Sequence, residues 1–87
     1  MRIILVISSL AISTAALADP QCTSEPAGKW IPQAEMMKKI VAMGHHVDVF
    51  KTTKGNCYEI YGKNTAGKRI EIYFNPVTGE IVKQASK

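Results

Sequence analysis

The chain has 87 residues and a formal net charge of +4 at pH 7, and 21% of its residues are charged. This length suits one small domain, whose core by itself gives only marginal stability. Lysine and arginine are spread along the sequence and do not cluster with aromatic side chains, which argues against a nucleic-acid-binding protein.

Residues 1–18 have the pattern of a secretory signal peptide. Arg2 is followed by an apolar stretch over residues 3–12 and then by Ala16-Leu17-Ala18, a small-x-small cleavage site. Because the apolar stretch is short for a membrane span and contains serine and threonine, we expect cleavage after Ala18 and no stable membrane insertion afterwards. The mature protein, residues 19–87, is therefore expected to be periplasmic or secreted.

Cys22 and Cys57 are the only two cysteines, and both lie in the mature part of the chain. An exported protein meets oxidising conditions, so these residues are predicted to form one disulfide bond. A redox-active or metal-binding pair is the alternative, but the two cysteines lack the close C-x-x-C spacing that such chemistry favours. Residues 19–30, with Pro20 and Pro26, are predicted to form an extended arm that ends at Trp30, a candidate lid over one edge of the core.

Residues 32–44 have the pattern of a helix, with Pro32 suited to its first position and Gly44 to its C-terminal cap. The apolar residues between them recur at helical spacing and predict a broad stripe packed on a sheet, made of Ala34, Met36, Met37, Ile40, Val41 and Met43. Methionine sulfur also suits Cu(I), but Met36 and Met37 point in different directions on a helix, so packing is the favoured interpretation.

Four further segments, residues 45–53, 57–63, 68–74 and 80–83, are predicted to be strands separated by turns. They indicate an α+β fold in which one helix packs on a three- to four-stranded antiparallel sheet. The face under the helix is expected to carry Tyr58, Ile60, Ile70, Ile72 and Phe74.

The register of the first hairpin has two possible solutions. A two-residue loop would pair Val49 with Ile60, whereas a three-residue loop with a bulge would pair Phe50 with Ile60 and Lys51 with Glu59. We favour the second.

The other face of the sheet is the candidate binding surface, with Glu59, Tyr61, Glu71 and Tyr73. Paired glutamates can perform acid/base chemistry when one of them is buried enough to raise its pKa. On an exposed face, which we expect here, Glu59 and Glu71 would instead form cross-strand polar pairs. Since the sequence has no glycine-flanked nucleophile turn either, we do not expect an enzyme.

His46 and Asp48 share one side of the first strand and form a weak candidate for a metal or pH-sensing site. A third ligand cannot be assigned, so a solvated strand edge is the expected role of this pair. No cofactor is predicted.

The helix followed by alternating strands, ending in YFNPVTGEIV at residues 73–82, resembles a PepSY domain. Residues 57–61, CYEIY, together with Cys22 and Trp30, are similar to small exported stand-alone members that carry a cysteine pair. The resemblance covers residues 31–83 and divides the chain into a signal peptide, the arm at 19–30 and a PepSY-like domain at 31–87. Asn75 stands where the family commonly has aspartate.

PepSY domains occur in propeptides of secreted metalloproteases and in envelope proteins, and are thought to bind or restrain peptidases. The resemblance therefore implies a non-enzymatic module that binds a protein or peptide in the cell envelope, through a sheet edge or the candidate face, and that regulates or inhibits a peptidase. The alternative is a small metal- or ligand-binding accessory protein that uses His46 and Asp48.

Overall fold

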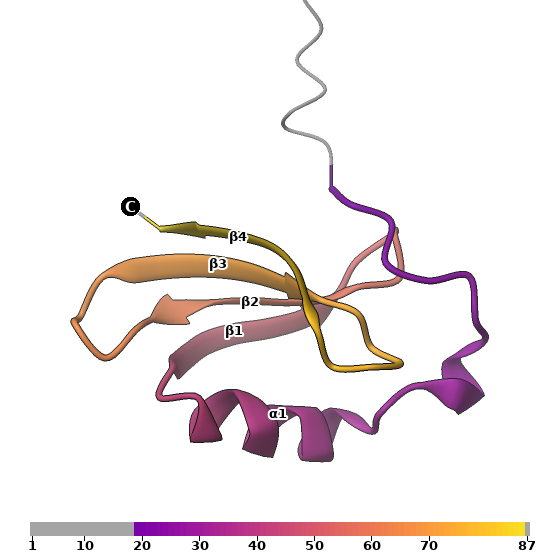
Figure 1. Cartoon of the computed structure of the whole chain (residues 1–87), viewed down its shortest axis with the longest axis horizontal. Helices are drawn as coiled ribbons and strands as arrows, with labels where there is room; N and C mark the ends of the chain where they lie inside the picture. The colour runs from indigo at the N-terminus through magenta and orange to yellow at the C-terminus, as the bar shows by residue number, and fades with distance from the viewer. Residues whose placement is uncertain (1–18, 87) are drawn as a thin grey trace, which may run out of the picture.

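One helix lies along one face of a four-stranded antiparallel sheet in the computed structural model, which describes residues 19–86 (Figure 1). The predicted α+β fold is therefore confirmed, with four strands. The predicted signal peptide lies outside the described residues. No helix within the described part of the chain is long and apolar enough to cross a membrane.

The elements follow in the order expected from the sequence. A short 3-10 turn, η2 (Ala27–Lys29), precedes the helix α1 (Gln33–Ala42). The strands are β1 (His46–Thr52), β2 (Tyr58–Lys63), β3 (Arg69–Phe74) and β4 (Ile81–Ser86), and they lie in this same order in the sheet. Short turns between neighbours dictate this meander, because an antiparallel pair needs only a tight connection.

The helix begins one residue later than predicted and presents a narrower apolar stripe. Pro32 is the N-cap rather than the first helical residue, and Gly44 follows the C-cap with a positive φ of 96°. Met36 and Ile40 are buried, whereas Ala34, Val41 and Met43 are exposed. A single helix on an open sheet buries only the side chains that point directly at the sheet, so the stripe predicted from spacing was too broad.

The core lies between α1 and the first face of the sheet. Its strand residues are the predicted Tyr58, Ile60, Ile70, Ile72 and Phe74, and each is at most 4% exposed. Trp30 packs against this core, with its ring edge-on to Tyr58 at 5.6 Å between centroids. Its indole N–H donates to the Glu25 carbonyl, so the predicted lid is held in place by the arm itself.

The first hairpin has the favoured register, with Phe50 opposite Ile60 and Lys51 opposite Glu59. Thr53 N–H donates to the Cys57 carbonyl across the loop, and Asn56 adopts a left-handed φ of 60°. Asparagine tolerates this conformation better than most residues, which explains its place in the loop. A second irregularity was not predicted: β1 has a bulge between Val47 and Val49, where Asp48 is the extra residue.

Candidate functional site: the second face of the sheet

The second face of the sheet, opposite α1, carries two rows of side chains that run across all four strands. One row consists of Lys51, Glu59, Tyr73 and Lys83, and the next consists of Val49, Tyr61, Glu71 and Ala85. The four predicted binding residues, Glu59, Tyr61, Glu71 and Tyr73, are thus neighbours, as strand alternation requires.

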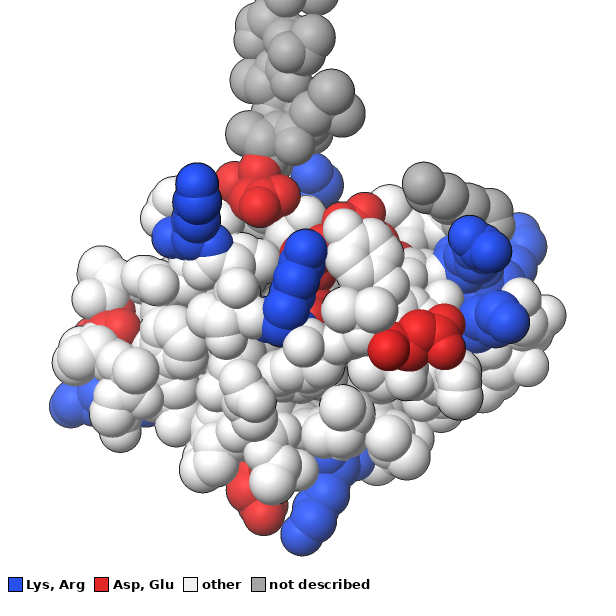
Figure 2. All heavy atoms as spheres, turned by 180° about the vertical axis from the view of Figure 1, so that it is seen from behind, with Lys and Arg blue, Asp and Glu red and all other residues white. Residues whose placement is uncertain are grey.

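This face is only partly open to solvent, so the expectation of an exposed face is wrong for half of it. Glu59 is 2% exposed and Tyr73 is 5% exposed, whereas Tyr61 is 39% exposed. On the side of the molecule shown in Figure 2, carboxylate atoms are recessed in the middle of the surface behind neighbouring side chains. Glu59 is buried whereas Glu71 is half-buried, so the two glutamates have different environments.

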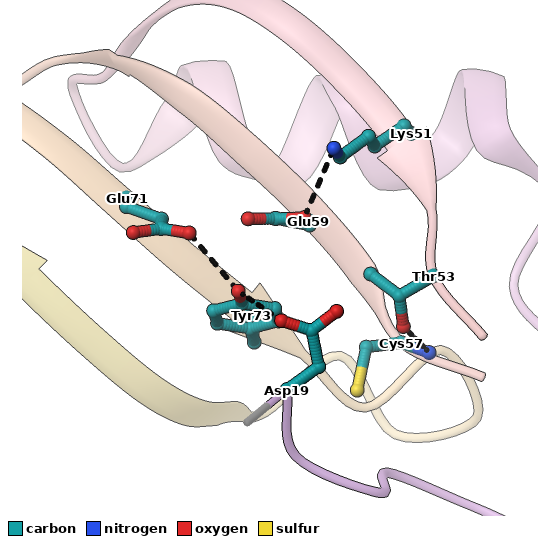
Figure 3. Close-up of polar contacts among 7 residues, drawn as sticks. All are labelled: Asp19, Lys51, Thr53, Cys57, Glu59, Glu71 and Tyr73. Carbon is teal, nitrogen blue, oxygen red and sulfur yellow. Dashed lines mark hydrogen bonds and ion pairs between the residues drawn. The ribbon is translucent and has the colours of Figure 1, made fainter. Parts of the chain in front are cut away.

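The N-terminal arm covers the buried half. The predicted Cys22–Cys57 disulfide is present, and Cys22 N–H donates to the Gly55 carbonyl at 2.9 Å. A side chain at Gly55 would collide with the Pro20 backbone, so glycine is what lets the arm lie this close. At the start of the arm, Asp19 accepts a hydrogen bond from the Tyr73 hydroxyl at 2.9 Å (Figure 3).

Asn75 joins the arm to the β3–β4 turn. Its side-chain oxygen accepts from the N–H groups of Val77 and Thr78, which holds the turn, and its side-chain NH₂ donates to the Cys22 carbonyl at 3.1 Å. An aspartate could make the first contacts but could not donate to a carbonyl. Asparagine therefore suits a chain whose arm is tied down beside this turn.

Asn75→Asp is expected to lower the free energy of unfolding by about 1–2 kcal/mol, because it replaces the donor to Cys22 by an acceptor facing a carbonyl. Urea denaturation measures this change. Asn64→Asp is the matched control, since the Asn64 side-chain oxygen only accepts, from the N–H groups of Ala66 and Lys68. Equal stability of the two variants would contradict the assigned role of Asn75.

Tyr73 stands between two carboxyl groups. Its hydroxyl oxygen lies 2.9 Å from Asp19 Oδ1 and 3.0 Å from Glu71 Oε2. A phenol has one proton, so the hydroxyl donates to one of these oxygens at a time. Tyr73 therefore links Asp19 of the arm to Glu71 of β3.

Glu59 lies directly opposite Tyr73 on β2, and the carboxyl groups of Glu59 and Glu71 point towards each other (Figure 3). Burial raises the pKa of Glu59, and its hydrogen bond with Glu71 raises it further, while Lys51, 3.7 Å away, acts in the opposite direction. The hydrogen bond from Glu59 lowers the pKa of Glu71. The arrangement therefore favours the neutral form of Glu59 beside an ionised Glu71.

The tyrosines complete this network. A hydrogen bond to Glu59 raises the pKa of Tyr61, and burial together with the hydrogen bond to Asp19 raises that of Tyr73. Both phenols thus remain protonated donors. The buried carboxyl that acid/base chemistry needs is present in Glu59, whose Oε1 lies 3.7 Å from Lys51 Nζ and whose Oε2 is buried without a hydrogen-bond partner among the described residues.

A hollow of about 260 Å³ opens beside the exposed half of the second face. It is lined by Asp48, Tyr61, Gly62, Lys63, Arg69, Ile70 and Glu71. The β1 bulge places Asp48 at its rim, and Gly62 allows the bulged strand to come close, because a side chain there would collide with the His46 carbonyl. Sequence reasoning missed Asp48, Lys63 and Arg69 as lining residues, since the bulge has no local sequence signal.

His46 and Asp48 do come together, with His46 Nε2 3.1 Å from Asp48 Oδ1, and both side chains are well exposed. Across residues 19–86, no group of three or more histidine, cysteine, aspartate or glutamate side chains is arranged to hold a metal ion. Met36 is buried in the core. The described geometry therefore gives the metal alternative no further support.

The helix, the antiparallel sheet and the disulfide-tethered arm define a small α+β module. The chain belongs to the family described as "Peptidase propeptide and YPEB domain" (PepSY_2), whose family model matches residues 2–85. This match confirms the PepSY resemblance and suggests a propeptide-like or regulatory module related to peptidases. Searches of curated proteins and of solved structures gave no match.

Proposed function

We propose that this protein is an exported, non-enzymatic module that binds a protein or peptide through the part of the second face that the arm leaves open. The partner class that the family suggests is a peptidase, whose activity the module regulates or inhibits. The observation that carries the proposal is an exposed spot, made of one apolar and one aromatic side chain, on this open part of the face.

This spot is formed by Val49 and Tyr61, which lie directly opposite each other on β1 and β2 and are 46% and 39% exposed. Lys51 Nζ lies 5.4 Å from the centre of the Tyr61 ring, close enough for a cation–π contact. Tyrosine gives a large contact area with a polar end, which suits a protein-binding surface.

The face supports this role better than the sheet edges do. A regular edge can accept a partner strand by backbone pairing. Both edge strands have a shifted register here, between Val47 and Val49 in β1 and opposite Tyr73 and Phe74 in β4. Such irregularities interrupt the row of backbone groups that an added strand would need.

A photo-crosslinking amino acid in place of Tyr61 tests this proposal in cells that express the whole chain. We expect it to capture a specific protein, which mass spectrometry identifies and a peptidase assay then characterises. The matched control is the same amino acid in place of Val41, which is 55% exposed on α1. Equal capture at both positions, or capture at neither, would contradict binding through this face.

A further inference from the structure

We propose that Lys63 and Arg69 form a carboxylate-binding site in the hollow, and that its occupant is an acidic side chain of the bound protein or peptide. This inference rests on the proposed function and names the chemistry that the partner must present. It uses two residues that lie beyond the candidate face predicted from the sequence.

The first argument is a pair of like charges that face each other without a direct ion-pair partner. Lys63 and Arg69 are directly opposite each other on β2 and β3, in an arrangement that is destabilising for like charges. Within residues 19–86, neither side chain has an ion pair or hydrogen bond with a carboxylate. A carboxylate between them would relieve the repulsion, and arginine can bind it with two parallel hydrogen bonds.

The second argument is that the acidic groups of the hollow already have partners. Asp48 contacts His46 at 3.1 Å, and Glu71 Oε2 lies 3.0 Å from the Tyr73 hydroxyl oxygen. They leave the two cations available for an added carboxylate. Together the four charges nearly cancel, so the site suits one carboxylate rather than a polyanion such as nucleic acid or an anionic membrane surface.

The third argument is size and position. The hollow measures about 260 Å³, below the roughly 300–1,000 Å³ typical of small-molecule sites, and has room for one or two side chains. Tyr61 lines it and also belongs to the exposed spot described above. An extended peptide could therefore place an apolar side chain on Val49 and Tyr61 and the adjacent acidic one between Lys63 and Arg69. Figure 2 shows basic side chains gathered at this end of the molecule.

The test uses the purified, disulfide-bonded protein, labelled with nitrogen-15, and a capped hexapeptide that alternates tyrosine with glutamate. The same peptide with glutamine in place of glutamate is the ligand control. The variant is Lys63→Gln with Arg69→Gln, and the matched variant, Lys38→Gln with Lys54→Gln, removes the same charge from exposed positions away from the hollow.

We expect the glutamate peptide to shift the amide signals of Tyr61, Lys63 and Arg69 saturably, and the glutamine peptide to bind at least about tenfold more weakly. The Lys63/Arg69 variant should lose about the same factor, and the matched variant should bind like the wild type. Equal binding of the two peptides, unchanged binding by the Lys63/Arg69 variant, or no saturable shift would each overturn the inference. Shifts caused only by phosphatidylglycerol vesicles would also overturn it, in favour of a lipid surface.

These outcomes are separate from those of the crosslinking experiment. If Tyr61 captures a specific protein while the peptides fail to discriminate, binding through the face stands and the carboxylate site is wrong. If Tyr61 captures nothing while the glutamate peptide binds as expected, the carboxylate site stands as a peptide-binding site and the proposed protein partner is wrong.

Discussion

Reduction of the Cys22–Cys57 disulfide is expected to lower the free energy of unfolding by about 3–4 kcal/mol, the value that the chain-entropy model gives for a loop of this length. The two cysteines are 35 residues apart, so the bond closes a loop that includes α1 and β1 and ends at the start of β2. A domain of this size has few other sources of stability, which makes this a large share of the total.

The measurement is urea denaturation of the oxidised and the fully reduced wild-type protein. Reduction keeps both sulfur atoms, so the packing of Cys57, which is 0% exposed, changes less than it would on substitution. Cys22→Ala with Cys57→Ala is the control, because the reductant should leave its stability unchanged. A difference below about 1 kcal/mol between the oxidised and reduced protein would contradict the role of the disulfide as the main staple.

Loss of the disulfide should also uncover the second face. The arm is held by its hydrogen bonds to Gly55, Asn56 and Asn75 and by the Asp19–Tyr73 contact, all of which depend on the position of Cys22. In the reduced protein we expect faster hydrogen exchange of the backbone amides in residues 19–26 than in β2 and β3. This would assign the arm to the least stable part of the domain.

Glu59→Gln is expected to remove a fall in stability that the wild-type protein shows as the pH rises above the ordinary glutamate pKa of 4.5. Glu59 has a pKa above its ordinary value of 4.5, because it is buried and hydrogen-bonded to Glu71. The contribution of Glu59 to stability is complete below its ordinary pKa. It is lost as the pH rises through the pKa of Glu59 in the folded protein. One proton gives a slope of at most about 1.4 kcal/mol per pH unit.

Glu71 acts in the opposite direction. The pKa of Glu71 is lowered, mainly by the hydrogen bond from Glu59. Its contribution to stability is therefore present above its ordinary pKa of 4.5 and is lost as the pH falls through its pKa in the folded protein. The wild-type protein should therefore be most stable at mildly acidic pH, where the pair holds one proton. Besides Glu59 and Glu71, the charged and titratable groups around the pair are Asp19, Lys51, Tyr61, Tyr73 and Lys83.

Denaturation midpoints measured from acidic to mildly alkaline pH check the prediction. Glutamine is the appropriate substitute, because it stays neutral and can donate to Glu71 as a protonated carboxyl does. Glu35→Gln is the control, since Glu35 is an exposed residue of α1 whose contact with Lys38 is 3.5 Å long, and its curve should run parallel to that of the wild type. Parallel curves for Glu59→Gln and the wild type would show that the pair holds no shared proton.

Much of the fold can be predicted from local sequence patterns. Alternation assigned Ile60 and Ile72 to one face and Glu59 and Glu71 to the other, since successive residues in a strand point to opposite sides. Turn residues separated the strands, whereas the register of the first hairpin stayed a choice between two loop lengths, and the structure has the favoured one. The disulfide bond could be predicted from the presence of only two cysteines in the sequence and from the expected oxidising compartment.

The candidate site could be predicted only in part. The four residues of the second face are neighbours, as predicted, but their solvent exposure depends on a segment far away in the sequence. Asp19 contacts Tyr73 across 54 positions, and Cys22 contacts Asn75 across 53. No local pattern reports such contacts, so Glu59 was expected to be exposed although the arm and its neighbours bury it.

The hollow is a second feature that depended on tertiary structure. Lys63 and Arg69 flank a turn and look like ordinary solvent-exposed charges in the sequence. Their role as lining residues comes from the pairing of β2 with β3 and from the bulge at Asp48, which the close approach of Gly62 permits.

By itself, the sequence determined the helix, the order and faces of the strands and the disulfide, because short-range periodicity and turn chemistry specify these. Only the tertiary structure decided which part of the second face the arm covers, because this depends on contacts between residues far apart in the chain. In the same arrangement Glu59 is buried beside Glu71, while Val49, Tyr61 and the hollow remain open to a partner.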